Sequence, residues 1–284
     1  MTAIDPISVV VTTYNRSDAL RAVLVGLAAQ DDMDFQLVIA DDGSSPHHVK
    51  ASERAIDDLG LAADYVWHPD VGFTASKVRN LGVLRARGRY LVFLDGDCVP
   101  DTDFVRRHRL LREDGCFVNG SRVLLSSDLT ARVLLHQEQV YGRNFLYWFT
   151  RWREKSANKW TAPVRFPDLG LRKKPQFSLR GIRSCNLGVW RSDYEAVDGF
   201  DETFVGWGHE DADLALRLHH AGVVRKNGFY ATEVYHLWHA EASRRDESFN
   251  AQRVRERMQT LQIKADRGLG TCDLDAPVRV KSWG

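Results

Sequence analysis

The sequence predicts an α/β fold with a mostly parallel central sheet flanked by helices. Short apolar runs alternate with helical patterns through the first 112 residues, and several of these runs end in polar side chains. Strands that alternate with helices in this way form parallel sheets covered by helices. Hydrophobic residues make up 44% of the 284 residues, so the chain is able to bury a sizeable core.

The first half of the chain supplies four strand and helix pairs. The apolar runs are continuous, as in strands that are buried on both faces. We expect strands at 7–13, 35–40, 64–67 and 90–95, each followed by a helix, at 17–29, 46–58, 74–87 and 101–112.

The second half is less regular. We expect helical material between 129 and 154, a loop at 163–175, a strand at 184–190, a helix at 210–221, a strand at 230–236 and a last helix at 246–264. No linker or repeat divides the chain, which predicts one domain over 1–265. Gly268, Gly270 and Pro277 argue against regular structure in the tail at 266–284.

Composition excludes several protein classes. The longest apolar stretches are about five residues, whereas a transmembrane helix needs roughly 20. Residues 1–5 lack the pattern of a secretory signal. The cysteines are too scattered for a zinc knuckle or a dense disulfide framework, which suits a reducing cytosol. We therefore expect a cytoplasmic protein.

Asp95-Gly96-Asp97 directly follows the apolar run 90–94. The two carboxylates reach the carboxyl edge of the sheet, where open α/β folds bind ligands. Paired carboxylates suit a hard divalent cation that is bound to a diphosphate. The alternative is an ordinary turn, because Asp and Gly favour turns after strands.

Two earlier strands also end in polar side chains, at Thr12 to Arg16 and at Asp41 to Ser45. A strand-terminal Asp is able to accept the imide N–H of a uracil ring, while Tyr14 stacks on the ring and Arg16 meets phosphate. The alternative is a Ser17 helix cap and an Asp-Gly turn. A further polar segment, 206–214, opens an amphipathic helix.

Together and in this order, the segments 12–16, 41–44, 72–82, 95–97 and 207–211 resemble the family 2 inverting glycosyltransferases with the GT-A fold. The resemblance covers 7–239, and the carboxyl half is similar to chondroitin-polymerase modules and to the galactosyltransferase C-terminal family. It implies a Rossmann-like central sheet, with a nucleotide-sugar half over about 1–120 and an acceptor half over about 121–265. His209 departs from the pattern, because relatives often carry Gly there.

The resemblance implies a metal-dependent enzyme that moves a hexose-type sugar from a UDP-sugar to a saccharide or lipid-linked saccharide, in cell-envelope polysaccharide synthesis. Asp97 is the expected ligand of Mn²⁺ or Mg²⁺, joined by His236 and His239, and an imidazole ligand favours Mn²⁺. The alternative to metal binding is that each His is a structural residue. The alternative to donor binding by Lys77 is a position on a solvated helix face. The residues expected to bind the donor are Thr12, Tyr14, Asn15, Arg16, Asp42, Lys77, Arg79, Asp95, Gly96 and Asp97.

Asp211 is the candidate general base, because a carboxylate at a helix start beside Trp207 is able to point at an acceptor hydroxyl. Trp207 is expected to stack on a sugar ring, and Glu210 and Asp213 are expected to bind acceptor hydroxyls. The alternative is that these acids simply stabilise the positive end of the helix dipole.

The segment 143–183 is rich in basic and aromatic residues. This mixture suits an anionic bilayer at the inner face of the cell membrane, or a charged lipid-linked saccharide. The alternative is a solvated helix whose aromatic residues pack on the core. No nucleic-acid module accompanies the segment, so we expect no nucleic-acid partner.

Two other functions compete with transfer. A sugar-1-phosphate nucleotidyltransferase usually has a glycine-rich basic loop after its first strand, whereas residues 12–16 contain no glycine. A catalytically silent sugar-nucleotide or glycan-binding module would not need Asp95, Asp97, Asp211 and the His pair together.

Overall fold

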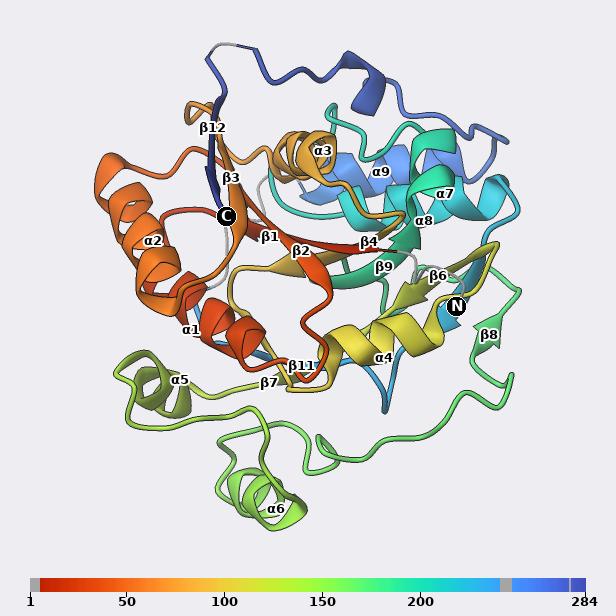
Figure 1. The fold of residues 1–284 in the computed structure, drawn as a ribbon. Helices are drawn as coiled ribbons and strands as arrows, with labels where there is room; N and C mark the ends of the chain where they lie inside the picture. The colour runs from red at the N-terminus through yellow and green to blue at the C-terminus, as the bar shows by residue number, and fades with distance from the viewer. Residues whose placement is uncertain (1–5, 241–246, 276) are drawn as a thin grey trace, which may run out of the picture.

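A nine-stranded sheet forms the centre of the protein (Figure 1). The computed structural model describes residues 6–240, 247–275 and 277–284. The strand order is β12-β3-β2-β1-β4-β9-β6-β10-β8. Its parallel part consists of β3 (Ala63–Trp67), β2 (Phe35–Asp41), β1 (Ile7–Thr13) and β4 (Tyr90–Asp95). The predicted α/β class and the four parallel strands are confirmed.

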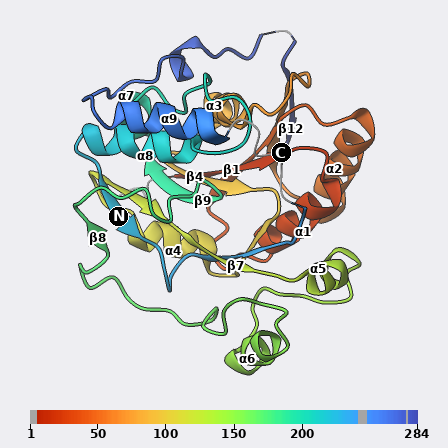
Figure 2. The same ribbon diagram turned by 180° about the vertical axis from the view of Figure 1, so that it is seen from behind.

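Helices cover both faces of this sheet because side chains alternate along each strand. Val9 and Val11 face one core and Val10 faces the other. The first core lies under α1 (Ser17–Ala28), α2 (Pro46–Leu59) and α4 (Phe104–Leu111). The second lies under α3 (Ala75–Arg85), α7 (Arg191–Ala196) and α8 (Glu210–His220), with α9 (Glu247–Arg257) against α8 (Figure 2).

The second half of the chain extends the sheet and adds a smaller one. Antiparallel β9 (Asn186–Trp190) joins β4 to β6 (Cys116–Asn119), and β10 (Val224–Asn227) and the short β8 (Lys173–Lys174) follow. The smaller sheet consists of β5 (Cys98–Pro100), β11 (Glu233–His236) and β7 (Ser121–Leu124). Since β5 begins directly after Asp97, this sheet brings His236 opposite Cys98 at the end of β4.

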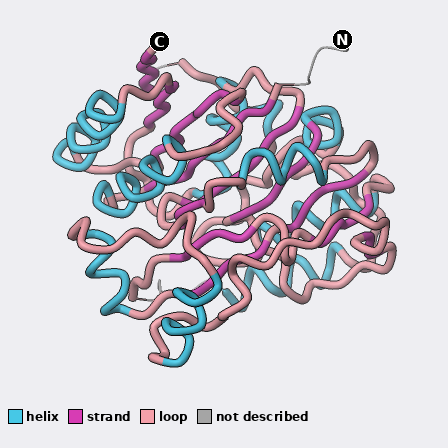
Figure 3. The backbone as a smooth tube through the Cα atoms, turned by 60° about the horizontal axis from the view of Figure 1, so that its bottom comes forward, coloured by secondary structure: helices cyan, strands magenta, loops and turns pink. Residues whose placement is uncertain are grey.

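Residues 129–154 form two helices instead of continuous helical material. The helices are α5 (Ser127–Leu134) and α6 (Phe145–Arg153), which lie beyond the smaller sheet and away from the central one (Figures 1 and 3). In the loop between these two helices, His136 and Gly142 have positive φ, a backbone conformation that stops a helix.

The prediction of an irregular tail at 266–284 is wrong in part. Leu269–Thr271 forms one turn of 3₁₀ helix, and β12 (Arg279–Trp283) pairs antiparallel with β3. Glycine and proline disfavour structure only up to Pro277, and the residues after it are free to pair. The Trp283 indole N–H donates to Asp57 Oδ1 at 2.6 Å and fixes the end of the strand.

Two predicted helices are shorter than expected. The helix at 101–112 begins at Phe104, because the chain leaves the strand β5 only at Pro100 and turns before the helix starts. The helix at 246–264 ends at Arg257, whose guanidinium is paired with Asp201.

Residue 246 and residues 1–5, the segment predicted to carry no secretory signal, lie outside the described residues. Within the described part of the chain, the helices are too short or too polar for any of them to cross a membrane.

Candidate active site

A cleft of about 620 Å³ opens at the carboxyl ends of β1 and β4. Most of the residues predicted to bind substrate or metal lie in its wall, although they come from distant parts of the sequence. They are Thr12, Tyr14, Arg16, Asp42, Arg79, Asp95, Gly96, Asp97, Trp207, His236 and His239. The sequence did not single out the other lining residues, among them Phe73, Arg122, Leu124 and Trp238.

Asp97 meets two imidazoles in this cleft. Its Oδ2 lies 3.1 Å from Nε2 of His239 and 3.8 Å from Nε2 of His236. Burial raises the pKa of Asp97, but the hydrogen bond from His239 and the charge of His236 outweigh burial and hold this pKa below its usual value. The carboxylate therefore stays ionised.

This donor set fits a divalent cation. One carboxylate oxygen lies within 4 Å of two ring nitrogens, a combination of donors that suits Mn²⁺. The described group whose ligand atoms all lie within 4.8 Å of one another contains Asp97 and His236 but not His239. The Cys98 thiol also lies within 4.8 Å of the Asp97 and His236 ligand atoms. Burial raises the pKa of this thiol well above its usual range, so it remains neutral.

Gly96 allows the Asp-Gly-Asp turn to pack against the end of β1. Its N–H donates to the carbonyl of Thr12 at 2.7 Å. A Cβ atom at position 96 would lie 2.8 Å from that carbonyl oxygen, which is too close for any side chain. The glycine therefore sets how far Asp95 and Asp97 enter the cleft.

Asp42 and Tyr14 line the part of the cleft above β1 and β2. Asp42 accepts hydrogen bonds from the Thr74 N–H and from His68 Nε2, both at 2.9 Å, and Tyr14 donates to Asp70 at 2.9 Å. His68 is 1% exposed and was not predicted, because a lone His after a strand carries no distinctive pattern.

Asn15 does not line the cleft, contrary to the predicted donor contact. It has a positive φ of 48°, its N–H donates to Ser44 Oγ, and its Oδ1 accepts from the Ser45 N–H. Asn15 therefore ties the loop after β1 to the loop after β2.

Arg79 connects the donor side of the cleft to α8. One guanidinium nitrogen lies 3.1 Å from Asp95 and another lies 3.1 Å from Glu210. The guanidinium also packs over the ring of Phe200 at 5.0 Å. Arg79 lines the cleft, and its two ion pairs hold Asp95 and Glu210 near each other. The donor contact of Arg79 and the acceptor contact of Glu210 stay predictions.

Lys77 does not line the cleft either. It lies on the same helix as Arg79, but its charge acts on Cys272, on the side of α3 that faces the C-terminal segment. Lys77 is partly exposed on α3, which agrees in part with the alternative stated for it, a solvated helix face.

Asp211 stands at the start of α8, as predicted. It is partly buried, and its Oδ1 accepts a hydrogen bond from the Ala212 N–H at 2.7 Å. Burial and the charge of Glu210 raise the pKa of Asp211 to about 7. A carboxyl group of this kind is able to take up and release a proton near neutral pH.

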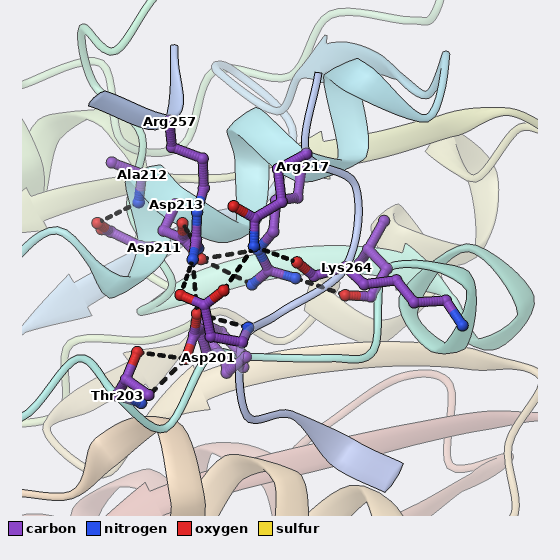
Figure 4. Close-up of polar contacts among 12 residues, drawn as sticks. Asp201, Thr203, Asp211, Ala212, Asp213, Arg217, Arg257 and Lys264 are labelled. Carbon is purple, nitrogen blue, oxygen red and sulfur yellow. Dashed lines mark hydrogen bonds and ion pairs between the residues drawn. The ribbon is translucent and has the colours of Figure 1, made fainter. Parts of the chain in front are cut away.

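The predicted acceptor contact of Asp213 is wrong. Asp213 is fully buried and ion-paired with Arg217 and Arg257, in a network that also contains Asp201 (Figure 4). Residues two positions apart lie on almost opposite sides of a helix. Asp211 therefore points away from this network while Asp213 points into it (Figure 4).

His209 is held in a left-handed conformation with a φ of 71°. We expect His209→Gly to raise the free energy of unfolding by about 0.5 to 1 kcal/mol, because the strain of a non-glycine residue outweighs the extra freedom of glycine in the unfolded chain. Urea titration measures the change. Gly208→Ala is the matched control, since φ is 101° there, and it should destabilise the protein. A His209→Gly protein that is less stable would show that the His side chain contributes more than the strain costs.

Much of the basic segment 143–183 stabilises the fold. Arg165 pairs with Asp101 and Asp103, and the buried guanidinium of Arg172 donates to backbone carbonyls. Trp148 is fully buried and stacks on Tyr235 with 4.5 Å between ring centroids. Exposed apolar side chains remain on and beside α6, at Phe145, Leu146, Trp152 and Trp160.

Comparison with known proteins identifies the family. The profile of glycosyl transferase family 2 matches residues 8–172, and that of the N-terminal domain of galactosyltransferase matches residues 168–240. The chain is 28% identical to chondroitin synthase of Escherichia coli over 236 residues, which is 77% of this chain and 33% of that protein. It is 30% identical to validoxylamine A glucosyltransferase of Streptomyces hygroscopicus subsp. jinggangensis over 229 residues, which is 76% of this chain and 52% of that protein.

The chain thus spans about a third to a half of the length of these two relatives. Among solved structures, S. aureus TarS 1–349 superposes with a TM-score of 0.55 at 15% identity, covering 93% of this chain and 67% of that one. This likeness supports the fold. The chain therefore belongs to glycosyl transferase family 2 and has the GT-A fold.

Proposed function

We propose that the protein is an inverting, metal-dependent transferase that moves a hexose-type sugar from a UDP-sugar to a saccharide or lipid-linked saccharide. The observation that carries this proposal is that Asp97, His236 and His239 lie together in one cleft. Asp211 is not among the residues that line this cleft, but it lies at the start of α8, behind Glu210 and Asp95. The charge of Asp95, in the wall of the cleft, acts on Asp211, so the two carboxylates lie near each other.

The donor side holds the nucleotide. Tyr14 and Asp42 flank the position for the uracil ring, and Arg16 is placed to meet phosphate. Asp97, His236 and His239 would hold Mn²⁺ or Mg²⁺, which when bound neutralises charge on the departing diphosphate. We infer that the donor half covers about 1–120 and the acceptor half about 121–265.

The acceptor side supplies the base. Trp207, at the rim of the cleft, offers a stacking face for a sugar ring. The ionised carboxylate of Asp211 takes the proton from the acceptor hydroxyl as that hydroxyl attacks the sugar. We infer that the base acts opposite the leaving group, so that a single displacement converts an α-linked donor into a β-linked product.

A direct test follows UDP release from a panel of UDP-sugars with Mn²⁺, with Mg²⁺ and with EDTA. We expect release that depends on the metal and that increases when a saccharide acceptor is added. Metal-independent release at the same rate would contradict the metal assignment. Binding of UDP-sugars without any turnover would instead favour a silent binding module.

A polysaccharide product fits the relatives, among which are a chondroitin synthase and a hyaluronan synthase of Pasteurella multocida. We infer a role in cell-envelope polysaccharide synthesis on the cytoplasmic side, with peripheral contact at the inner face of the membrane. The exposed apolar residues of α6 and its basic end at Arg151 and Arg153 favour that contact.

The membrane contact leads to a test on α6. Replacing both Leu146, 70% exposed, and Trp152, 42% exposed, by Ser should lower cosedimentation with anionic vesicles, because each residue supplies apolar surface to the bilayer interface. Leu110→Ser is the matched control, since Leu110 is 60% exposed on α4. Equal binding of all three proteins to the vesicles would contradict the proposal.

A further inference from the structure

Arg122 lies in the wall of the cleft, and no pattern in the sequence points to it. It is the second residue of β7 and pairs with Val234 of the neighbouring strand β11. His236 lies two residues after Val234 in β11. Its charge acts on His236 and on Lys159. The guanidinium therefore belongs to the substrate cleft.

The other cleft arginines are paired, whereas Arg122 is not. Arg16 pairs with Asp18, and Arg79 pairs with Asp95 and Glu210. Arg122 instead lies 3.9 Å from the sulfur of Cys185. No described carboxylate lies within ion-pair distance of it, although a partly buried charge normally requires such a partner.

Two more cations lie close to Arg122. Lys159 donates to the hydroxyl of Ser121, next to Arg122 in β7, at 2.7 Å and lies 3.4 Å from Glu233. The backbone N–H of Arg183 donates to Oδ1 of Asn119, the last residue of β6, at 3.2 Å. The side chain of Arg183 is exposed. Burial lowers the pKa of Lys159, and the charges of Arg183 and Arg122 lower it further, as expected for three neighbouring cations.

Glu233 is ion-paired with Lys159. The charge of Asp95 also acts on Arg122, but Asp95 is ion-paired with Arg79. A guanidinium with free donors suits carboxylate and phosphate groups, which it binds in a planar, two-pronged geometry. We propose that Arg122, assisted by Arg183, forms a subsite for an acidic sugar, one that carries a carboxylate or a phosphate, beside the donor cleft. The inference rests on the proposed function, because it specifies one of the two saccharide partners.

The acidic group belongs either to the donor sugar or to the acceptor, and two binding experiments separate these sources. The first compares UDP-glucuronate with UDP-glucose by calorimetry in Mn²⁺. The second compares a uronate-terminated or phosphate-terminated oligosaccharide with a neutral one of the same length, in the presence of UDP. The variants are Arg122→Gln, Arg183→Gln and the control Arg54→Gln, which removes an exposed charge on α2.

We expect Arg122→Gln to weaken binding of the acidic ligand roughly 10- to 100-fold in one of the two experiments, and binding of its neutral counterpart much less. Arg183→Gln should have a smaller effect with the same preference, and Arg54→Gln should bind like the wild type. If Arg122→Gln does not fold, which circular dichroism detects, the exposed Arg183 still tests the subsite.

Equal loss of acidic and neutral ligands, loss of binding to UDP itself, or no change in either variant would overturn the acidic subsite. These outcomes differ from failure of the proposed function. That failure would be a wild-type protein that binds neither UDP nor any UDP-sugar in Mn²⁺.

Discussion

Asp211→Asn should reduce the rate of sugar transfer by roughly 10² to 10⁴ while leaving UDP-sugar binding intact. Asn has nearly the same shape and still accepts the hydrogen bond from the Ala212 N–H, but it is unable to take a proton from the acceptor. Transition-state stabilisation is lost with little change in the ground state. Single-turnover rates and calorimetric binding to the same variant measure both effects.

The pH dependence of the wild type provides a second readout for Asp211. Its pKa is raised to about 7, so transfer should increase as pH rises through about 7, when the base becomes ionised. Stability should change in the opposite direction. The folded state keeps the proton where the unfolded state has lost it, so stability falls as pH rises from the ordinary value of 3.8 toward 7.

Asp211→Asn should remove this part of the pH dependence. The measurement is the free energy of unfolding of both proteins as a function of pH, and the difference between them isolates the contribution of Asp211. If the carboxylate served only the helix dipole, Asp211→Asn would transfer sugar normally and lose about 0.3 to 1 kcal/mol of stability. Normal turnover would therefore reject its assignment as the base.

Asp97→Ala should abolish most of the metal-dependent affinity for UDP. Its carboxylate is held ionised among two imidazoles, and removing it leaves the cation without its charged ligand. We expect a loss of about 2 to 5 kcal/mol in UDP binding with saturating Mn²⁺, as for truncating one member of a buried charge pair. Calorimetry with Mn²⁺ and with EDTA separates the metal-dependent part.

The two histidines refine this result. Replacing both His236 and His239 by Ala should weaken Mn²⁺ binding more than either single replacement. His68→Ala is a suitable control, because His68 lies on the other side of the cleft and contacts Asp42. Negligible and equal effects of all the His variants would remove the pair from the metal site, and unchanged UDP affinity in Asp97→Ala would make the Asp-Gly-Asp turn purely structural.

The first half of the fold could be predicted from the sequence, because its strands are continuous apolar runs and each is followed by a helix. The strands β5 to β8 and β10 are two to four residues long, and all of them except β5 contain polar residues, as in Lys173–Lys174. Such strands exist through their pairing with neighbours, and pairing between distant segments leaves little trace in local sequence.

The candidate site could be predicted from the sequence where a motif follows a strand, as at Asp95-Gly96-Asp97. It was harder to predict where the geometry of a helix determines which side chains face the cleft. Asp211 and Asp213 are both acids in one first turn, yet one lies near the cleft and the other is buried among arginines. Arg79 was expected to meet substrate, but its partners Asp95 and Glu210 are 16 and 131 residues away, so only the structure could identify them.

The C-terminal strand β12 connects the outer edge of the sheet to the nucleotide side of the cleft. The ring of Trp283 lies edge-on to Tyr65, with 6.5 Å between centroids, and the Tyr65 hydroxyl donates to Asp41, the neighbour of Asp42. Deleting residues 279–284 would strip the backbone groups of β3 of their partners, creating an edge prone to intermolecular strand addition. The same deletion would loosen the support beneath the loop that carries Asp42. A purification tag is therefore better placed at the amino end, since an altered carboxyl end threatens both solubility and nucleotide affinity.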